Sequence, residues 1–170
     1  RHLFFVSDHD VENPNAESIY SNIRVFEEGQ EEFQSPDFRV YETRIRTTAE
    51  IGEDLNVAGE FLLIPGSEIS DRFIFRDDSR APVHIVGTNL AENILPQRGG
   101  SVQATLQNNL AAIDEQSEWL GRPIMSHVAH PNFGSGITAE ELALVSTRFF
   151  EVYNGHPNVD NRGDDDKPSL

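Results

Sequence analysis

The sequence predicts an α/β protein in which mainly parallel strands alternate with helices. Short apolar runs recur along the chain, and stretches with apolar residues three and four positions apart separate them. Most of these runs are apolar at consecutive positions, which is typical of strands buried on both faces of a parallel sheet. The 170 residues suffice for one domain with its own core, and we find no internal repeat.

The first half of the chain contains two predicted strands. Residues 3–6 form the first apolar run, and residues 16–37 are ambiguous, with helical hints before an acidic loop. Across residues 38–55 the apolar positions fall at helical spacing, so a helix is expected there. Residues 61–64 are the next expected strand, which Pro65-Gly66 would close.

The third predicted strand, residues 83–86, is followed by the clearest helix signal in the chain. Ser101 is a suitable N-cap for a helix with apolar positions at 102, 106, 110 and 113. Gly121, with Pro123 just after it, provides the stop signal. A helix is therefore expected between Ser101 and Gly121.

The last third of the sequence predicts two more strands with a short helix between them. The strands are residues 124–129 and 148–153. Thr138 and Glu141 have the spacing of a capping box, which predicts that a helix begins there. Residues 160–170 are polar and acidic, and we expect a flexible tail.

Composition excludes several classes of function. The 13 Lys and Arg residues against 29 Asp and Glu residues give a net charge of −16, so sequence-independent nucleic-acid binding is not expected. Cysteine is absent, which excludes disulfides, zinc ribbons and a cysteine nucleophile. We find no signal peptide and no run long enough to cross a bilayer, so no membrane partner is expected. The compartment and the oligomeric state stay open.

Histidines and carboxylates cluster around the predicted strands. Asp8 and His9 follow the first strand, Glu68 follows the second, and His84 lies inside the third. Since reactive groups gather past the carboxyl ends of parallel strands, we expect these side chains to converge at one rim. Without cysteine, His and carboxylate ligands would bind zinc, manganese or iron.

Each of these residues alone also has a structural interpretation. A single histidine in a strand, such as His84, is more often a hydrogen-bonded core or surface residue than a ligand. Asp8 could be a turn residue, and Glu68 could be an exposed turn carboxylate. The prediction of a metal site therefore depends on the set rather than on any member.

Five short segments, in order along the chain, resemble motifs of the PHP (polymerase and histidinol phosphatase) superfamily of metal-dependent phosphoesterases. The family motifs, in one-letter amino-acid code, are TDH, PGxE, HxxG, HPN and EVYNG. The matching segments are residues 5–10, 65–70, 83–87, 130–132 and 150–155.

The resemblance implies a distorted (β/α)7 barrel, of which this chain would be a part, with two or three metal ions. It implies that four residues are metal ligands, and that Asp8 and Asn154 have catalytic or orienting roles. The ligands would be His9, Glu68, His84 and His130. His127, Glu151 and His156 are further candidates at the rim.

The sequence departs from the family pattern at both ends. The family has an H-x-H pair on its first strand and a D-x-H motif near its end, and neither is present here. The chain begins with Arg1 and contains one methionine, Met125. We therefore expect residues 1–170 to be a single PHP-like domain fragment that lacks the first strand and the C-terminal part of the barrel, and that is inactive alone.

The resemblance implies a metal-dependent phosphoesterase that hydrolyses a small phosphate ester through a di- or trinuclear centre. Two alternatives stay open: a metallohydrolase of other esters such as carbamates, and a degenerate domain without catalysis. A polymerase-associated nuclease is less favoured because the chain lacks a basic stripe. Residues 158–163 have some features of a calcium loop, but Arg162 occupies a ligand position and the distal Glu is missing.

Overall fold

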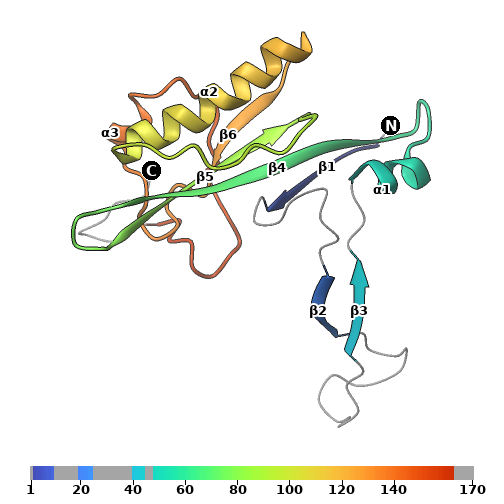
Figure 1. The fold of residues 1–170 in the computed structure, drawn as a ribbon, viewed down its shortest axis with the longest axis horizontal. Coiled ribbons are helices and arrows are strands. Elements are labelled where there is room, and N and C mark those ends of the chain that lie inside the picture. The colour runs from blue at the N-terminus through green and yellow to red at the C-terminus, as the bar shows by residue number, and fades with distance from the viewer. Residues whose placement is uncertain (1, 10–18, 25–39, 45–47, 163–170) are drawn as a thin grey trace.

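A four-stranded open sheet with one long helix against it forms the centre of the molecule (Figure 1). The computed structural model describes the backbone of residues 2–9, 19–24, 40–44 and 48–162, and the side chains of residues 49–162. The sheet order is β1-β4-β5-β6. Its strands are β1 (His2–His9), β4 (Phe61–Ile74), β5 (Arg80–Thr88) and β6 (Met125–Ala129).

The strand directions contradict the predicted parallel barrel. β4, β5 and β6 are antiparallel to their neighbours, and only β1 pairs with β4 in parallel. β1 and β6 are not paired with each other, so the sheet does not close. The prediction was wrong because continuous apolar runs show that strands are buried, but not in which direction they run.

The remaining elements in the described part of the chain are a two-stranded sheet and three helices. β2 (Ile19–Arg24) and β3 (Val40–Arg44) pair antiparallel. The helices are α1 (Thr48–Leu55), α2 (Val102–Leu120) and α3 (Ala139–Leu142). Of the helix predicted over residues 38–55, Thr48–Leu55 is helical, whereas Val40–Arg44 is a strand.

Two other predicted boundaries were wrong. The strand expected to end at Pro65-Gly66 continues through both residues to Ile74. Pro65 has no N–H for the ladder, but its carbonyl accepts a hydrogen bond from the backbone N of Asn89 at 2.7 Å. The strand expected at residues 148–153 is reduced to one parallel bridge between Phe150 and Val128.

Helix α2 confirms the local signals at both ends. The Ser101 side chain accepts a hydrogen bond from the backbone N of Ala104. Gly121 has φ of 61°, the left-handed conformation that ends a helix most easily when the residue is glycine. The capping box of Thr138 and Glu141 is also present, although α3 has only four residues.

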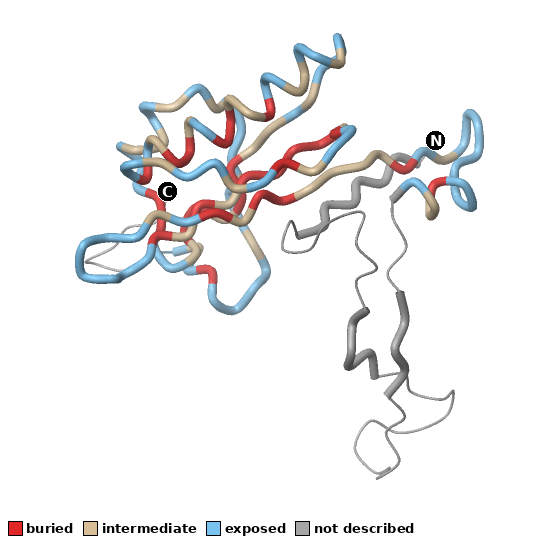
Figure 2. The backbone as a smooth tube through the Cα atoms, in the orientation of Figure 1, coloured by how far each residue is buried: buried red, intermediate tan, exposed pale blue. Residues whose placement is uncertain are grey.

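The core lies between α2 and one face of β4, β5 and β6 (Figure 2). Leu106, Leu110 and Ile113 of α2 pack with Ile69, Val83, Ile85 and Val128 of the sheet. Burial of such side chains contributes about 1.5–3 kcal/mol each to folding. The sheet positions that alternate with these core residues belong to the opposite face, and that face carries the candidate site.

A buried carboxylate, that of Asp71, connects several elements at the edge of this core through hydrogen bonds. Asp71 is 3% exposed and points to the α2 side of β4. Its Oδ2 accepts hydrogen bonds from Asn109 Nδ2 at 2.8 Å and from the backbone N of Arg98 at 2.9 Å. Its Oδ1 accepts from the backbone N of Arg72 at 2.7 Å. The carboxylate thus joins β4, α2 and the loop that precedes α2.

Candidate metal centre

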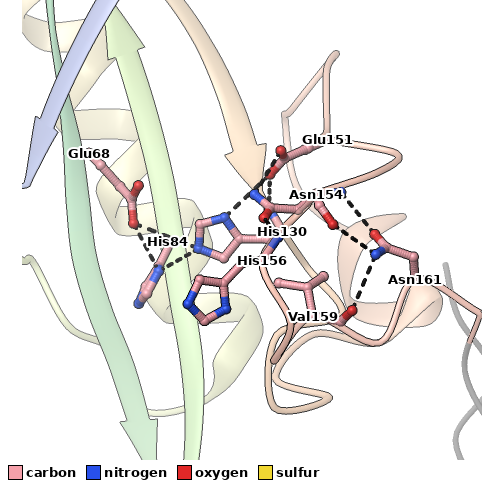
Figure 3. A network of polar contacts seen from close by, with 8 residues as sticks. All are labelled: Glu68, His84, His130, Glu151, Asn154, His156, Val159 and Asn161. Atoms are coloured by element: carbon pink, nitrogen blue, oxygen red, sulfur yellow. Dashed lines mark hydrogen bonds and ion pairs between the residues drawn. The ribbon is translucent and has the colours of Figure 1, made fainter. Parts of the chain in front are cut away.

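Three side chains from separate segments meet on the sheet face opposite α2 (Figure 3). Glu68 belongs to β4, His84 to β5, and His130 follows β6 directly. His84 Nδ1 lies 2.9 Å from Glu68 Oε1 and 2.8 Å from His130 Nε2. His130 Nε2 lies 3.7 Å from Glu68 Oε1. We call Glu68, His84 and His130 the triad.

The hairpin register brings the triad together. Ser70 is the backbone partner of His84, so Glu68 is the diagonal neighbour of His84 on the same face. Ala129 pairs with His84 on the other side, and His130 comes next. Glu68 and His84 therefore meet in the middle of the antiparallel β4–β5 hairpin, and His130 joins them from the end of β6, so the triad does not form at the carboxyl rim of parallel strands.

His130 sits in a tight turn, with φ of 26°. Its carbonyl accepts a hydrogen bond from the backbone N of Phe133 at 2.8 Å. A non-glycine residue with positive φ is costly and persists only where its surroundings hold it. The partner that holds His130 is Glu151.

Glu151 contacts His130 twice. Its Oε2 accepts a 2.7 Å hydrogen bond from the backbone N of His130 and lies 3.3 Å from His130 Nδ1. Residues 149–151 run beside β6, where Val128 N donates to Phe149 O and Glu151 N donates to Val128 O. Because Glu151 faces Nδ1, the proton of a neutral His130 ring belongs on Nδ1, which leaves the Nε2 lone pair for the triad.

An amide network supports Glu151 from behind. Asn154 Nδ2 donates to Glu151 Oε1 at 2.9 Å. Asn161 Oδ1 accepts from Asn154 N at 2.9 Å, and Asn161 Nδ2 donates to Asn154 O at 2.8 Å and Val159 O at 3.2 Å. Asn161 was not among the site residues predicted from the sequence. Asn161 lies in residues 158–163, the segment with some calcium-loop features, and this was the one sequence signal that could have indicated it. In the structure its side chain forms hydrogen bonds with the loop backbone.

His156, a further candidate from the sequence, packs beside the triad. Its ring lies against Phe133, with 6.2 Å between centroids, and Phe133 also contacts His84 and His130. His156 Nδ1 accepts a hydrogen bond from the backbone N of Asn158. His156 is thus near the triad, but it is not one of the residues that meet there within ligand distance.

His127 lies on the same sheet face as the triad. Val86 is the backbone partner of both Glu68 and His127, so Glu68, Val86 and His127 form one row. Burial lowers the pKa of His127 below its usual value, while the carboxylates of Glu151 and Glu68 act in the opposite direction. A lowered pKa keeps the ring neutral at pH 7, the form that can bind a metal.

Asp8 and His9 end β1. Their backbone partners on β4 are Ser67 and Glu68, so His9 continues the row that contains Glu68 and His127. The side chains of Asp8 and His9 are outside the residues whose side chains the structure describes. Their predicted roles stay predictions.

The triad fits a divalent cation in chemistry and in size. Two imidazole nitrogens and one carboxylate oxygen are a donor set that zinc uses in catalytic sites, where a fourth position stays open for water. Ligand atoms about 2.0–2.1 Å from a tetrahedral ion are about 3.3 Å from one another. The distances of 2.8, 2.9 and 3.7 Å between the triad atoms are close to this value.

No family model, curated protein or solved structure matches this chain. No helix in the described part of the chain has the length and hydrophobicity needed to cross a membrane. The arguments about function therefore depend on the site and on the motifs in the sequence.

Proposed function

We propose that this protein is a metal-dependent hydrolase that acts on a small phosphate ester, with a divalent cation bound by the triad. The observation that carries the proposal is the meeting of Glu68, His84 and His130, whose donor atoms lie within 4.8 Å of one another. The resemblance of five sequence segments to phosphoesterase motifs supports the same chemistry. The proposal does not depend on a barrel.

A bound divalent cation would activate water near neutral pH and balance the charge of the phosphate. The protein's contribution is to hold the donors. His84 and His130 would present nitrogen lone pairs, and Glu68 would supply negative charge from a largely buried position, with 8% of the residue exposed. Glu151 would hold the proton of His130 on Nδ1, a common arrangement around metal-bound histidines.

The sheet face around the triad excludes part of the solvent. The His84 and His130 side chains are 17% and 16% exposed. Phe133 covers both rings. Partial burial strengthens electrostatic interactions with a phosphate group, because the local dielectric constant is lower than that of water.

The test is metal binding followed by hydrolysis. We expect zinc or manganese to bind at stoichiometric levels and Glu68→Gln to lose most of that affinity. Glu118→Gln, an exposed matched control on α2, should bind like the wild type. A panel of phosphate, carboxyl and carbamate esters, tested with the complete protein that contains residues 1–170, then identifies the substrate class. Hydrolysis of carbamates alone would favour the second class of hydrolase, and absence of bound metal would favour a non-catalytic domain.

A further inference from the structure

The sheet face that carries the triad continues along the β4–β5 hairpin. Side chains alternate between the two faces of a strand, and the register of β4 with β5 is continuous from Gly66 to Ile74. Ile69, Asp71 and Phe73 therefore belong to the α2 side. The triad face carries Glu68, Ser70, Arg72 and Ile74 on β4, and Val86, His84, Pro82 and Arg80 on β5.

Two arginines stand on the triad face. Arg72 comes four residues after Glu68, and Arg80 comes four residues before His84. Arg72 pairs with Pro82, and Arg80 pairs with Ile74, so the arginines occupy adjacent rows on neighbouring strands. Four residues along a strand correspond to about 13 Å. Both arginines are thus at a similar distance from the triad, on one side of it.

Both guanidinium groups are available to a ligand. Arg72 and Arg80 are exposed, and neither forms an ion pair with any residue in the described part of the chain. Arg98 differs, because its Nε lies 4.0 Å from Asp71 Oδ1. Of the two acidic residues in the hairpin turn, Asp77 accepts hydrogen bonds from Ser79 N and Oγ, and Asp78 is exposed.

The two arginines stand out because the chain as a whole is strongly acidic. The chain has a net charge of −16, but two arginines that have no ion-pair partner among the described residues lie close together on the face of a candidate phosphate site and make a local positive region. Arginine binds phosphate oxygens through a planar fork of N–H donors. A positive region also attracts anions toward a site whose own carboxylates would repel them.

We propose that Arg72 and Arg80 form a second anion-binding subsite, and that the substrate is an organic phosphate with a second phosphate group. The spacing of the strand places this second group about 10–15 Å from the phosphate at the triad. This inference rests on the proposed function, because it takes the first phosphate to bind at the triad. It adds the class of substrate.

The test is a calorimetric measurement of binding with the metal-loaded protein. The ligands are an alkyl monophosphate and a series of alkanediol bisphosphates, whose span increases from well below to well above the proposed separation. We expect affinity to reach a maximum at an intermediate length, with a gain of about tenfold or more over the monophosphate.

Substitutions of the two arginines test whether they cause the gain in bisphosphate affinity. Arg72→Ala and Arg80→Ala should each reduce it, the double variant should abolish it, and monophosphate affinity should not change. Arg122→Ala is the matched control, since Arg122 is exposed beyond α2 and contacts Asn89. It should keep the full gain.

Two results would overturn the subsite. The first is that bisphosphates of every length bind with the same affinity as the monophosphate. The second is that Arg122→Ala reduces the gain in bisphosphate affinity as much as Arg72→Ala or Arg80→Ala does, which would indicate a general charge effect. Failure of the metal-loaded wild type to bind any monophosphate would count against the proposed function itself. The two failures are therefore distinguishable.

Discussion

Glu151 holds His130 through both the backbone and the ring: its Oε2 lies 2.7 Å from the backbone N and 3.3 Å from Nδ1. One carboxylate oxygen therefore stabilises a turn with positive φ and directs the other ring nitrogen toward Glu68 and His84. The geometry of the triad depends on a residue outside it.

Replacing Glu151 with Gln should weaken metal binding about 10–100-fold, as loss of such orienting partners commonly does. One oxygen of the carboxylate becomes an NH2 group, which cannot accept a hydrogen bond from Asn154 or from His130. Calorimetric titration with zinc measures the change. Glu140→Gln, exposed on α3, is the control, and equal affinities for the two variants would contradict the orienting role of Glu151.

Asn161→Ala should lower the free energy of unfolding by about 1–2 kcal/mol, since it removes three hydrogen bonds to the loop backbone. The same variant should weaken metal binding, because Asn154 positions Glu151. Urea unfolding and zinc titration measure the two effects. Asn158 is exposed on the same loop, so Asn158→Ala should change neither the free energy of unfolding nor the zinc affinity. A similar loss in both variants would show that any truncation in this loop has these effects.

Asp71→Ala should destabilise the fold without changing the metal site directly. Its carboxylate accepts from Asn109, Arg98 and Arg72, and the substitution leaves these buried or half-buried donors without their acceptor. We expect a loss of about 3 kcal/mol, measured by urea unfolding. Asp114→Ala, exposed on α2, should unfold like the wild type. A loss below about 1 kcal/mol would show that the network contributes little.

His127 predicts a dependence of stability on pH. Because burial lowers its pKa in the folded state, the unfolded chain binds more protons near and below the unperturbed pKa of about 6.5. The free energy of unfolding should therefore fall as pH decreases through this value. The decrease should be smaller in His127→Gln than in the wild type, both measured by urea unfolding with a chelator present. Parallel pH profiles for the two proteins would contradict the assignment.

Local signals predicted the parts of the fold that are determined locally. The N-cap at Ser101, the stop at Gly121 and the capping box at Thr138 act within one helical turn, and all three were confirmed. The extent of β4 was missed, because Pro65-Gly66 is a stop signal unless a neighbouring strand stabilises the segment.

The direction of the strands was not encoded in the apolar runs. Antiparallel pairing of β4 and β5 requires a tight connection, and residues 75–79 provide it. Asp78 has φ of 64°, which Asp tolerates better than most residues, and Asp77 caps the turn through Ser79. These turn residues are the sequence signal for a hairpin between β4 and β5.

For the candidate site, the sequence predicted the residues of the triad but not the reason they meet. Glu68, His84 and His130 were expected to converge at one rim of parallel strands, whereas the antiparallel register brings Glu68 and His84 together in mid-sheet and His130 reaches them from the end of β6. Glu151 and Asn154 were expected at the rim and support His130 instead. Contacts of Asn161 depend on the path of the final loop, which no local pattern predicts.

The ligand shell of bound zinc, measured by X-ray absorption spectroscopy, shows whether the triad binds the ion. If Glu68, His84 and His130 bind the ion, the shell contains two imidazole nitrogens at about 2.0–2.1 Å in the wild type and one in His84→Ala. A shell without imidazole scattering, or one that stays the same in His84→Ala, would contradict the assignment of Glu68, His84 and His130 as the metal site.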